Sequence, residues 1–176
     1  MLPSEIQRSL SSNRGVSPGY LETLGVPLVS GRYIDARDVR DAPAVAVINE
    51  AMARTFWSDQ DPLGRQFRMG TGGDTLFTVV GVVGDMRAVA LGEPAFPEVY
   101  VPLDQVGFSF MWPRQLVVRS SGDARALAPA LRQVVRDIDA DQPVASIVTM
   151  NEVIDGTLET RDTQLKLIGA FAMIAR

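Results

Sequence analysis

The residues that could do chemistry in this sequence are mainly carboxylates and arginines, because two reactive residue types are missing. The 176-residue chain has no cysteine and no histidine. This excludes disulfides, thiol nucleophiles, imidazole bases, and zinc or haem ligation through those side chains. The only lysine, Lys166, follows Gln164 and Leu165 rather than a glycine-rich loop, so we reject both a P-loop and Schiff-base chemistry.

Alternating aspartates at Asp137, Asp139 and Asp141 suggest a calcium-binding loop. An EF-hand loop also needs glycine at its sixth position and glutamate at its twelfth. Here those positions hold Gln142 and Val148. The pattern therefore predicts a solvated helix end, and we expect no metal site.

A pair of carboxylates could still act as the general acid and base of a hydrolase. Acidic residues are plentiful, but most lie in predicted loops or at helix ends, where solubility and capping explain them. No group of residues combines a nucleophile, a base and an oxyanion site. We therefore expect no catalytic residue and no cofactor, with the hydrolase kept as an alternative hypothesis.

Two glycine-rich segments resemble phosphate-binding loops only superficially. Residues 70–74 lie between two predicted strands, whereas phosphate loops usually lead into a helix N-terminus. Residues 81–85 lack the full spacing of a dinucleotide-binding fingerprint. We interpret the first as a hairpin tip and expect no nucleotide site.

An aromatic segment is the best candidate for a contact with a partner. Phe108, Phe110, Met111 and Trp112 lie close together in a predicted loop before a strand. Aromatic residues and methionine are enriched in protein interfaces. The alternative is that this segment packs over the domain's own core.

The composition indicates an ordinary folded domain in which these residues must be positioned. Hydrophobic residues make up 46% of the chain and charged residues 22%, with a net charge of −4. This excludes wholesale disorder, and it argues against a reader of duplex nucleic acid, which normally carries a basic excess. The length fits one domain or two small ones.

The first half of the chain predicts short helices and strands in alternation. Residues 17–25 predict a helix capped by Ser17 and ended by Gly25, followed by an extended edge segment at 26–29. Residues 44–48 predict a buried strand, and Asn49 is placed to cap a helix over residues 50–57. Residues 31–43 predict a surface loop.

Residues 66–69 and 76–83 predict a hairpin. Gly81 within it suggests a bulge or a close approach of another backbone segment. Residues 98–101 predict a further strand.

The last third predicts a strand–helix–strand unit and then a long helix. Residues 116–119 and 144–148 are the expected strands, and apolar residues over 127–138 recur on one helical face. Thr149 and Glu152 have the spacing of a capping box.

The helix that would begin there becomes almost wholly apolar from Leu165 onward. It is either a buried C-terminal helix or the first turns of a membrane span. The polar residues 1–15 are expected to form a flexible lead-in or a truncated edge.

Seven segments of the chain resemble the sequence blocks of a known family, and they occur in the same order. They are residues 16–28 with Gly31 and Arg32, 45–57, 61–65, 79–87, 97–102, 116–119 and 139–144.

This ordered set resembles the MacB-like periplasmic core domain of FtsX-type ABC transporter permeases, most of all the duplicated-permease branch. The resemblance implies a two-lobed α+β fold. Residues 16–44 and 98–163 would form a porter-like lobe of strand–helix–strand units, and residues 45–97 a smaller inserted β-rich lobe. Residues 164–176 would begin a truncated transmembrane helix.

The same resemblance implies a function without catalysis. The domain would lie on the periplasmic side of the inner membrane and couple ATP-driven helix movement to substrate export, handover or mechanical transmission. Its partners would be a cytoplasmic ABC ATPase, another permease half or subunit, a periplasmic adaptor, and the membrane through flanking helices. The alternative is a free-standing binding module that uses the segment from Phe108 to Trp112.

Overall fold

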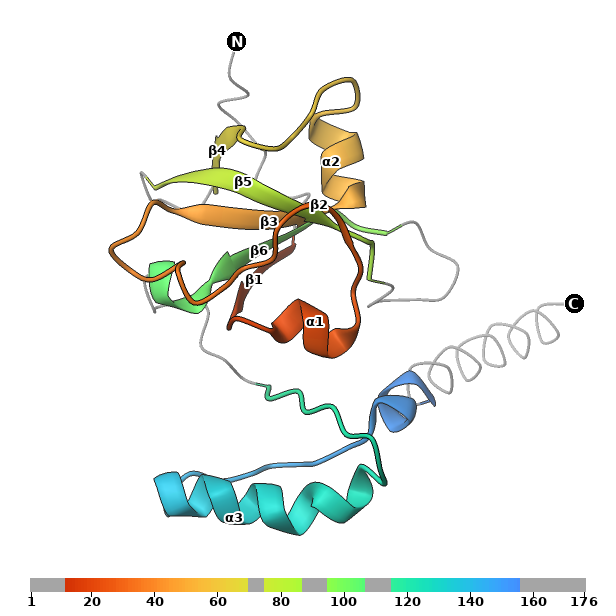
Figure 1. Ribbon diagram of the computed structural model, residues 1–176. Helices are drawn as coiled ribbons and strands as arrows, with labels where there is room; N and C mark the ends of the chain where they lie inside the picture. Colours follow the sequence, from red (N-terminus) through yellow and green to blue (C-terminus); the bar gives the residue numbers. More distant parts are fainter. Residues whose placement is uncertain (1–11, 70–74, 87–94, 107–114, 156–176) are drawn as a thin grey trace, which may run out of the picture. The chain divides into compact units, whose positions relative to one another are not determined.

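The computed structural model describes residues 12–69, 75–86, 95–106 and 115–155 (Figure 1). The chain divides into two compact units, Met1–Val118 and Arg119–Arg176. The described part of the first unit combines a six-stranded mixed sheet with short helices. The predicted α+β class is therefore confirmed.

The sheet of the first unit has the strand order β1-β6-β3-β5-β2, and β4 pairs with β5 beside that path. The β1–β6 and β3–β5 pairs are parallel, and the other pairs are antiparallel. Strands that are distant in sequence thus become neighbours. The bounds are β1 Ser12–Val16, β2 Leu28–Gly31, β3 Val45–Asn49, β4 Gln66–Arg68, β5 Leu76–Val83 and β6 Glu98–Pro102.

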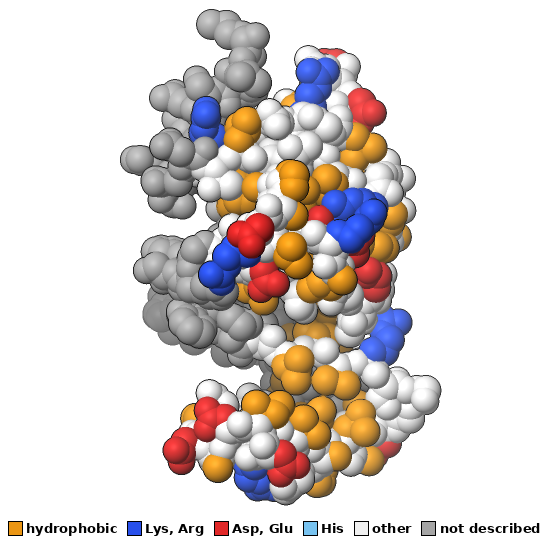
Figure 2. All heavy atoms as spheres, turned by 60° about the vertical axis from the view of Figure 1, so that its left-hand side comes forward, with side chains coloured by type: hydrophobic (Ala, Val, Ile, Leu, Met, Phe, Trp, Pro, Cys, Tyr) orange, Lys and Arg blue, Asp and Glu red, His pale blue; other side chains and the backbone are white. Residues whose placement is uncertain are grey.

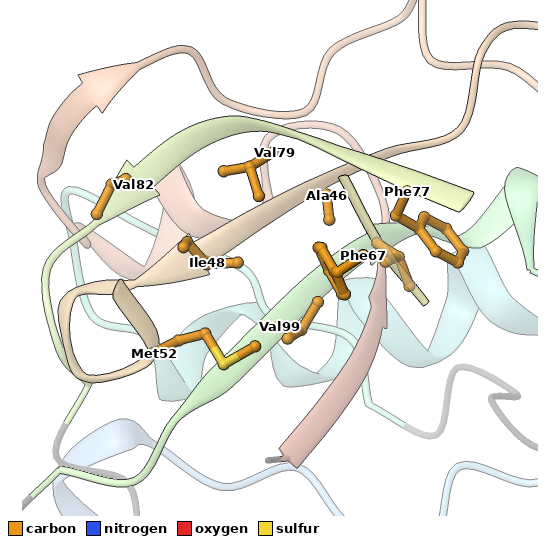
Figure 3. Packing of buried hydrophobic residues seen from close by; sticks show 9 residues of the cluster. Ala46, Ile48, Met52, Phe67, Phe77, Val79, Val82 and Val99 are labelled. Carbon is orange, nitrogen blue, oxygen red and sulfur yellow. The ribbon is translucent and has the colours of Figure 1, made fainter. Parts of the chain in front are cut away.

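The sheet buries apolar side chains on both faces because successive residues of a strand point to opposite sides. Ala46 and Ile48 of β3 pack with Met52 of helix α2 (Glu50–Phe56), as Figure 3 shows. Val47 points to the other face and joins Leu21 of helix α1 (Tyr20–Leu24). All five residues of β3 are buried, which confirms the predicted buried strand.

The capping signals in the sequence predict one helix correctly and the other only in part. The Asn49 side chain accepts a hydrogen bond from the Met52 amide at 2.9 Å and caps α2, as predicted. Gly25 ends α1 with a φ of 74°, also as predicted. The N-cap of α1 is Gly19, with a φ of 82°, and not Ser17. A left-handed residue is needed there, and glycine adopts it without strain.

Gly81 lies where another backbone segment approaches closely, as the sequence indicated. A Cβ atom at this position would lie 2.0 Å from the carbonyl oxygen of Arg32. The pairing register between β3 and β5 also shifts between Ala46 and Val47, next to Gly81. The predicted hairpin is present as β4 and β5, and its tip at residues 70–74 lies outside the described residues.

Two other features of the first unit differ from expectation. Residues 12–15, expected within a flexible lead-in or a truncated edge, belong to β1 and pair with β6. The predicted surface loop 31–43 buries Ile34 and Asp38. The sheet also contains strands from both predicted lobes, and the boundary between the compact units follows Val118. The division into a porter-like and an inserted lobe stays a prediction.

The second unit contains helix α3 (Ala128–Ile138), with Pro129 in its first turn, where a missing amide costs nothing. The strands predicted at 116–119 and 144–148 are wrong, since these segments have no regular secondary structure. Their apolar residues satisfy a strand pattern, but a strand also needs a pairing partner. The 3-10 turn η2 (Arg125–Leu127) precedes α3, and η1 (Leu103–Gln105) follows β6 in the first unit.

The capping box at residues 149–152 is confirmed. The Glu152 carboxylate accepts hydrogen bonds from the Thr149 amide at 2.7 Å and from its hydroxyl at 2.9 Å, and residues 150–155 are helical. On the apolar stripe of α3, Val134 and Ile138 are exposed and the other residues are half-buried. Figure 2 shows hydrophobic side chains on the lower part of the molecular surface.

No helix within the described residues is long and apolar enough to span a membrane. The apolar segment from Leu165, together with the lead-in before Ser12, lies outside those residues.

Candidate functional site

A buried polar cluster joins the strands β1 and β6, and we call it the β1–β6 polar cluster (Arg14, Glu98, Tyr100 and Asn49). Arg14 donates from Nε and Nη2 to Oε1 of Glu98 at 3.2 and 3.0 Å. The Tyr100 hydroxyl donates to Oε2 of the same carboxylate at 2.6 Å. Both carboxylate oxygens are therefore occupied.

Strand geometry explains why these three side chains meet. Glu98 and Tyr100 are two residues apart on β6, so they point to the same face. Arg14 is the register partner of Tyr100 on the neighbouring strand. Glu98 is only 4% exposed and Tyr100 is fully buried. A buried carboxylate is tolerated only when a cation and hydrogen bonds compensate the loss of water, and Arg14 and Tyr100 supply both.

Electrostatics within the cluster favours its present protonation state. Burial disfavours the charged guanidinium of Arg14, but the carboxylate of Glu98 outweighs it and raises the Arg14 pKa. Burial and the hydrogen bond to Glu98 raise the pKa of Tyr100 well above its usual range. Arg14 stays charged and Tyr100 stays neutral at every ordinary pH. Arg14 and Tyr100 therefore both act as hydrogen-bond donors to Glu98.

Asn49 extends the cluster into the centre of the sheet. Its Oδ1 accepts from the backbone amides of Met52 and Glu98, both at 2.9 Å. Its Nδ2 donates to the carbonyl of Phe96 at 2.8 Å. This side chain is fully buried. One asparagine thus caps α2 and fastens the start of β6 to β3.

A second polar group closes the loop after β2. Arg32 donates from Nη1 and Nη2 to the two carboxylate oxygens of Asp38, each at 2.7 Å. Burial disfavours ionisation of Asp38, but hydrogen bonds from Arg32 and from the Asp35 amide outweigh it and lower the Asp38 pKa. Hydrogen bonds from Arg37 lower the pKa of Asp35 strongly.

A third polar contact fixes the start of α2. Asp85 accepts from the Ala51 amide at 2.8 Å and from Arg54 Nη2 at 2.7 Å. The carboxylate thereby satisfies a free amide in the first helical turn. It also connects the end of β5 with α2.

These polar contacts hold segments of the first unit together. Among the described residues, every buried side-chain nitrogen and oxygen has a hydrogen-bond partner. The same residues contain no group of three or more acidic side chains that could hold a metal ion. The two buried carboxylates of the described residues, Glu98 and Asp38, are each paired with an arginine within the fold.

The residues predicted to contact a partner, Phe108, Phe110, Met111 and Trp112, lie outside the described residues. Sequence reasoning missed the β1–β6 polar cluster. The available signal was a glutamate alternating with tyrosine inside an apolar strand, which requires a buried partner for the charge. Arg14, which pairs with this glutamate, is 84 residues away along the chain. Nothing in a single sequence connects Arg14 with Glu98.

The family assignment follows from the match along the chain. The sequence profile of the family described as "MacB-like periplasmic core domain" matches residues 4–138, which is most of the chain. The chain belongs to this family. A MacB-like domain of this kind is a periplasmic domain of an ABC transporter permease, and the resemblance noted in the sequence is confirmed.

Curated relatives agree with the family. The MacB-like domain is 27% identical to the macrolide export ATP-binding/permease protein MacB of Rhodopseudomonas palustris strain HaA2, over 92% of the chain and 25% of the relative. It is 23% identical to the uncharacterized ABC transporter permease YknZ of Bacillus subtilis strain 168, over 92% of the chain and 40% of the relative. The chain therefore spans less than half the length of these relatives.

Solved structures show the same fold. The periplasmic region of MacB from Actinobacillus actinomycetemcomitans superposes with a TM-score of 0.58 and 18% identity, over 82% of this chain and 64% of that one. The extracellular domain of the transporter YknZ gives a TM-score of 0.51 and 18% identity, over 74% of this chain and 65% of that one. The MacB-like domain thus shares the fold of these two domains.

Proposed function

We propose that this MacB-like domain couples ATP-driven movement of membrane helices to substrate export, handover or mechanical transmission on the periplasmic side of the inner membrane. The domain itself is not catalytic. ATP hydrolysis would take place in a cytoplasmic ABC ATPase, which acts on the domain through the full permease. The observation that carries this proposal is the family match over residues 4–138.

The use of polar groups in the structure supports a mechanical role. The buried charges Glu98 and Asp38 are paired with arginines inside the fold. An acid or base catalyst needs a proton that is exchangeable near neutral pH and faces a substrate. A domain that transmits displacement needs rigid contacts between its own elements, and paired buried charges provide such contacts.

The two compact units give the domain parts that could move relative to each other. A domain connected on both sides to membrane helices can convert helix displacement into relative movement of such parts. We therefore propose that ATP hydrolysis changes the distance between the sheet unit and the unit that contains α3.

A distance measurement in the working permease tests this proposal. Gln60 in the first unit and Ala140 in the second are exposed, and the chain has no cysteine of its own. Gln60→Cys and Ala140→Cys would carry a donor and an acceptor dye in the full reading frame, freed of other cysteines and reconstituted with its ATPase. Energy transfer should change when ATP is added.

Two controls make the result decisive. An ATPase subunit that binds but does not hydrolyse ATP should hold one distance, and a dye pair within the first unit at Gln60 and Asp104 should not change. The proposal is wrong if the distance between the units is the same during hydrolysis and without nucleotide.

The aromatic segment stays a proposed contact for a partner of the permease. We propose that Phe108, Phe110, Met111 and Trp112 face a periplasmic adaptor or another permease subunit. Its support is the compositional preference of interfaces for aromatic residues and methionine. A photo-crosslinking residue at Phe110 should then capture one defined protein in cells, and the same residue at exposed Gln60 should not. Equal capture at both positions would argue against the contact.

A further inference from the structure

The first and last described strands of the sheet unit, β1 and β6, are neighbours in the sheet. They run parallel, and Ser12 pairs with Glu98 at one end and Val16 with Pro102 at the other. The chain enters β1 at Ser12 and leaves β6 at Pro102. Because the strands are parallel, entry and exit lie at opposite ends of the pair (Figure 1).

We propose that the β1–β6 pair is a shear clamp, through which tension on the chain crosses the sheet unit without passing through the other strands. This inference rests on the proposed mechanical function for its role in the permease. It adds the specific element that bears the force and the residues that secure it, which the family assignment does not supply.

The geometry decides how the pair resists tension. A pull on Ser12 away from the pair and a pull on Pro102 in the opposite direction slide the strands past one another. All five residue pairs of the register are then loaded together. A pull that separates the strands from one end loads the evenly spaced backbone hydrogen bonds one after another. The first geometry therefore needs a higher rupture force than the second.

The β1–β6 polar cluster lies within this pair and reinforces it. The two hydrogen bonds from Arg14 to Glu98 cross from β1 to β6. Tyr100 holds the second oxygen of the carboxylate from the β6 side. Hydrogen bonds between charged groups are stronger than neutral ones, and burial of the Glu98 carboxylate limits the access of water to that side of the pair.

Asn49 anchors β6 on its other side. Its side chain accepts from the Glu98 amide and donates to the Phe96 carbonyl. The start of β6 is thus tied to β3, in the middle of the sheet. Sliding of β1 against β6 then occurs against a fixed base, and the strand order places β3, β5 and β2 beyond the clamp.

Optical tweezers on the full 176-residue chain test the clamp directly, because handles can be attached at introduced cysteines only. Handles at Ser12→Cys and Asp104→Cys load the pair in shear. Handles at Ser12→Cys and Phe96→Cys peel the pair from one end. Ser12, Asp104 and Phe96 are exposed. We expect the first rupture force to be several-fold higher in shear than in peeling at the same loading rate.

Glu98→Gln tests the role of the polar cluster, and Asp38→Asn is its matched control. Both substitutions remove a carboxylate that is less than one-tenth exposed and paired with an arginine, but Asp38 lies outside the clamp. Glu98→Gln should lower the shear rupture force markedly, and Asp38→Asn should leave it close to that of the original chain. Arg14→Gln removes the same pair from the half-exposed side, and should reproduce the effect of Glu98→Gln.

Equal rupture forces in the two pulling geometries would overturn the clamp, and so would an equal loss from Glu98→Gln and Asp38→Asn. Refolding between successive pulls shows that each variant starts from the folded state. This experiment needs no ATPase and no membrane. A failed clamp therefore leaves the proposed coupling testable by dye distances, and a failed coupling leaves the rupture forces unchanged.

Discussion

Replacing Asn49 by alanine should destabilise the sheet unit more than any other single loss of an amide side chain in its described part. The side chain is fully buried and makes three hydrogen bonds. Loss of a helix N-cap costs about 1 kcal/mol. Loss of the acceptor for the buried Glu98 amide costs about 1–3 kcal/mol more. We therefore expect the free energy of unfolding to fall by roughly 3 kcal/mol.

The loss can be measured by urea denaturation of the full chain. Trp57 packs edge-on against Phe56 and Phe67 within the sheet unit, so its fluorescence in a Trp112→Phe background reports the unfolding of that unit. In thermal unfolding the same loss corresponds to a decrease in Tm of about 10 °C for a chain of this size.

Gln60→Ala is the control, because this exposed side chain should change stability by no more than about 0.5 kcal/mol. A loss for Asn49→Ala as small as that of the control would refute the reasoning that this side chain caps α2 and fastens β6 at the same time.

Three further perturbations follow from the structure. Gly81→Ala should destabilise by about 1–3 kcal/mol or more in urea denaturation, because the new Cβ would lie 2.0 Å from the Arg32 carbonyl oxygen. The lowered pKa of Asp38 means that its contribution to stability is present above its unfolded pKa of 3.8 and is lost as the pH falls below it, so Asp38→Asn should flatten the acid limb of a stability–pH profile. Thr149→Ala should cost about 1 kcal/mol of helix stability, seen by circular dichroism, because it breaks the capping box with Glu152.

Each of these predictions has a contradicting outcome. Gly122→Ala is the control for Gly81→Ala, because no atom lies within 4 Å of its added Cβ, and equal losses would show that the close approach has no energetic weight. If the acid limb of the stability–pH profile is unchanged in Asp38→Asn, other carboxylates cause the loss of stability at low pH. Unchanged helicity in Thr149→Ala would show that the capping box does not stabilise the start of the helix.

Local signals in the sequence predicted most of the elements in the first unit. Asn49 before a helix, Gly25 after one and the buried strand that begins at Val45 each depend on contacts within a few residues. Such contacts follow from capping and from hydrophobic periodicity. Gly81 could be recognised in the same way, since a glycine inside a strand often marks a bulge or a point where another backbone segment comes close.

Features that depend on distant partners could not be predicted. Residues 12–15 look like part of a polar lead-in because their partner strand, β6, is far along the chain. Glu98 inside an apolar strand requires a partner for its charge, but no local signal identifies Arg14 as that partner. Residues 116–119 and 144–148 carry a strand pattern, but no local rule shows whether a partner strand exists. For the same reason, the lobes implied by the resemblance stay a prediction.

The coupling, and the role of the clamp within the permease, require that this domain lies outside the cytoplasm as part of a membrane protein. One measurement tests that placement directly. The full reading frame with Gln60→Cys as its only cysteine is expressed in its native host, and intact cells with a permeabilised outer layer receive a membrane-impermeant maleimide. We expect labelling without lysis, on a protein that leaves the membrane fraction only with detergent. Labelling only after lysis, or a protein recovered without detergent, would contradict the account.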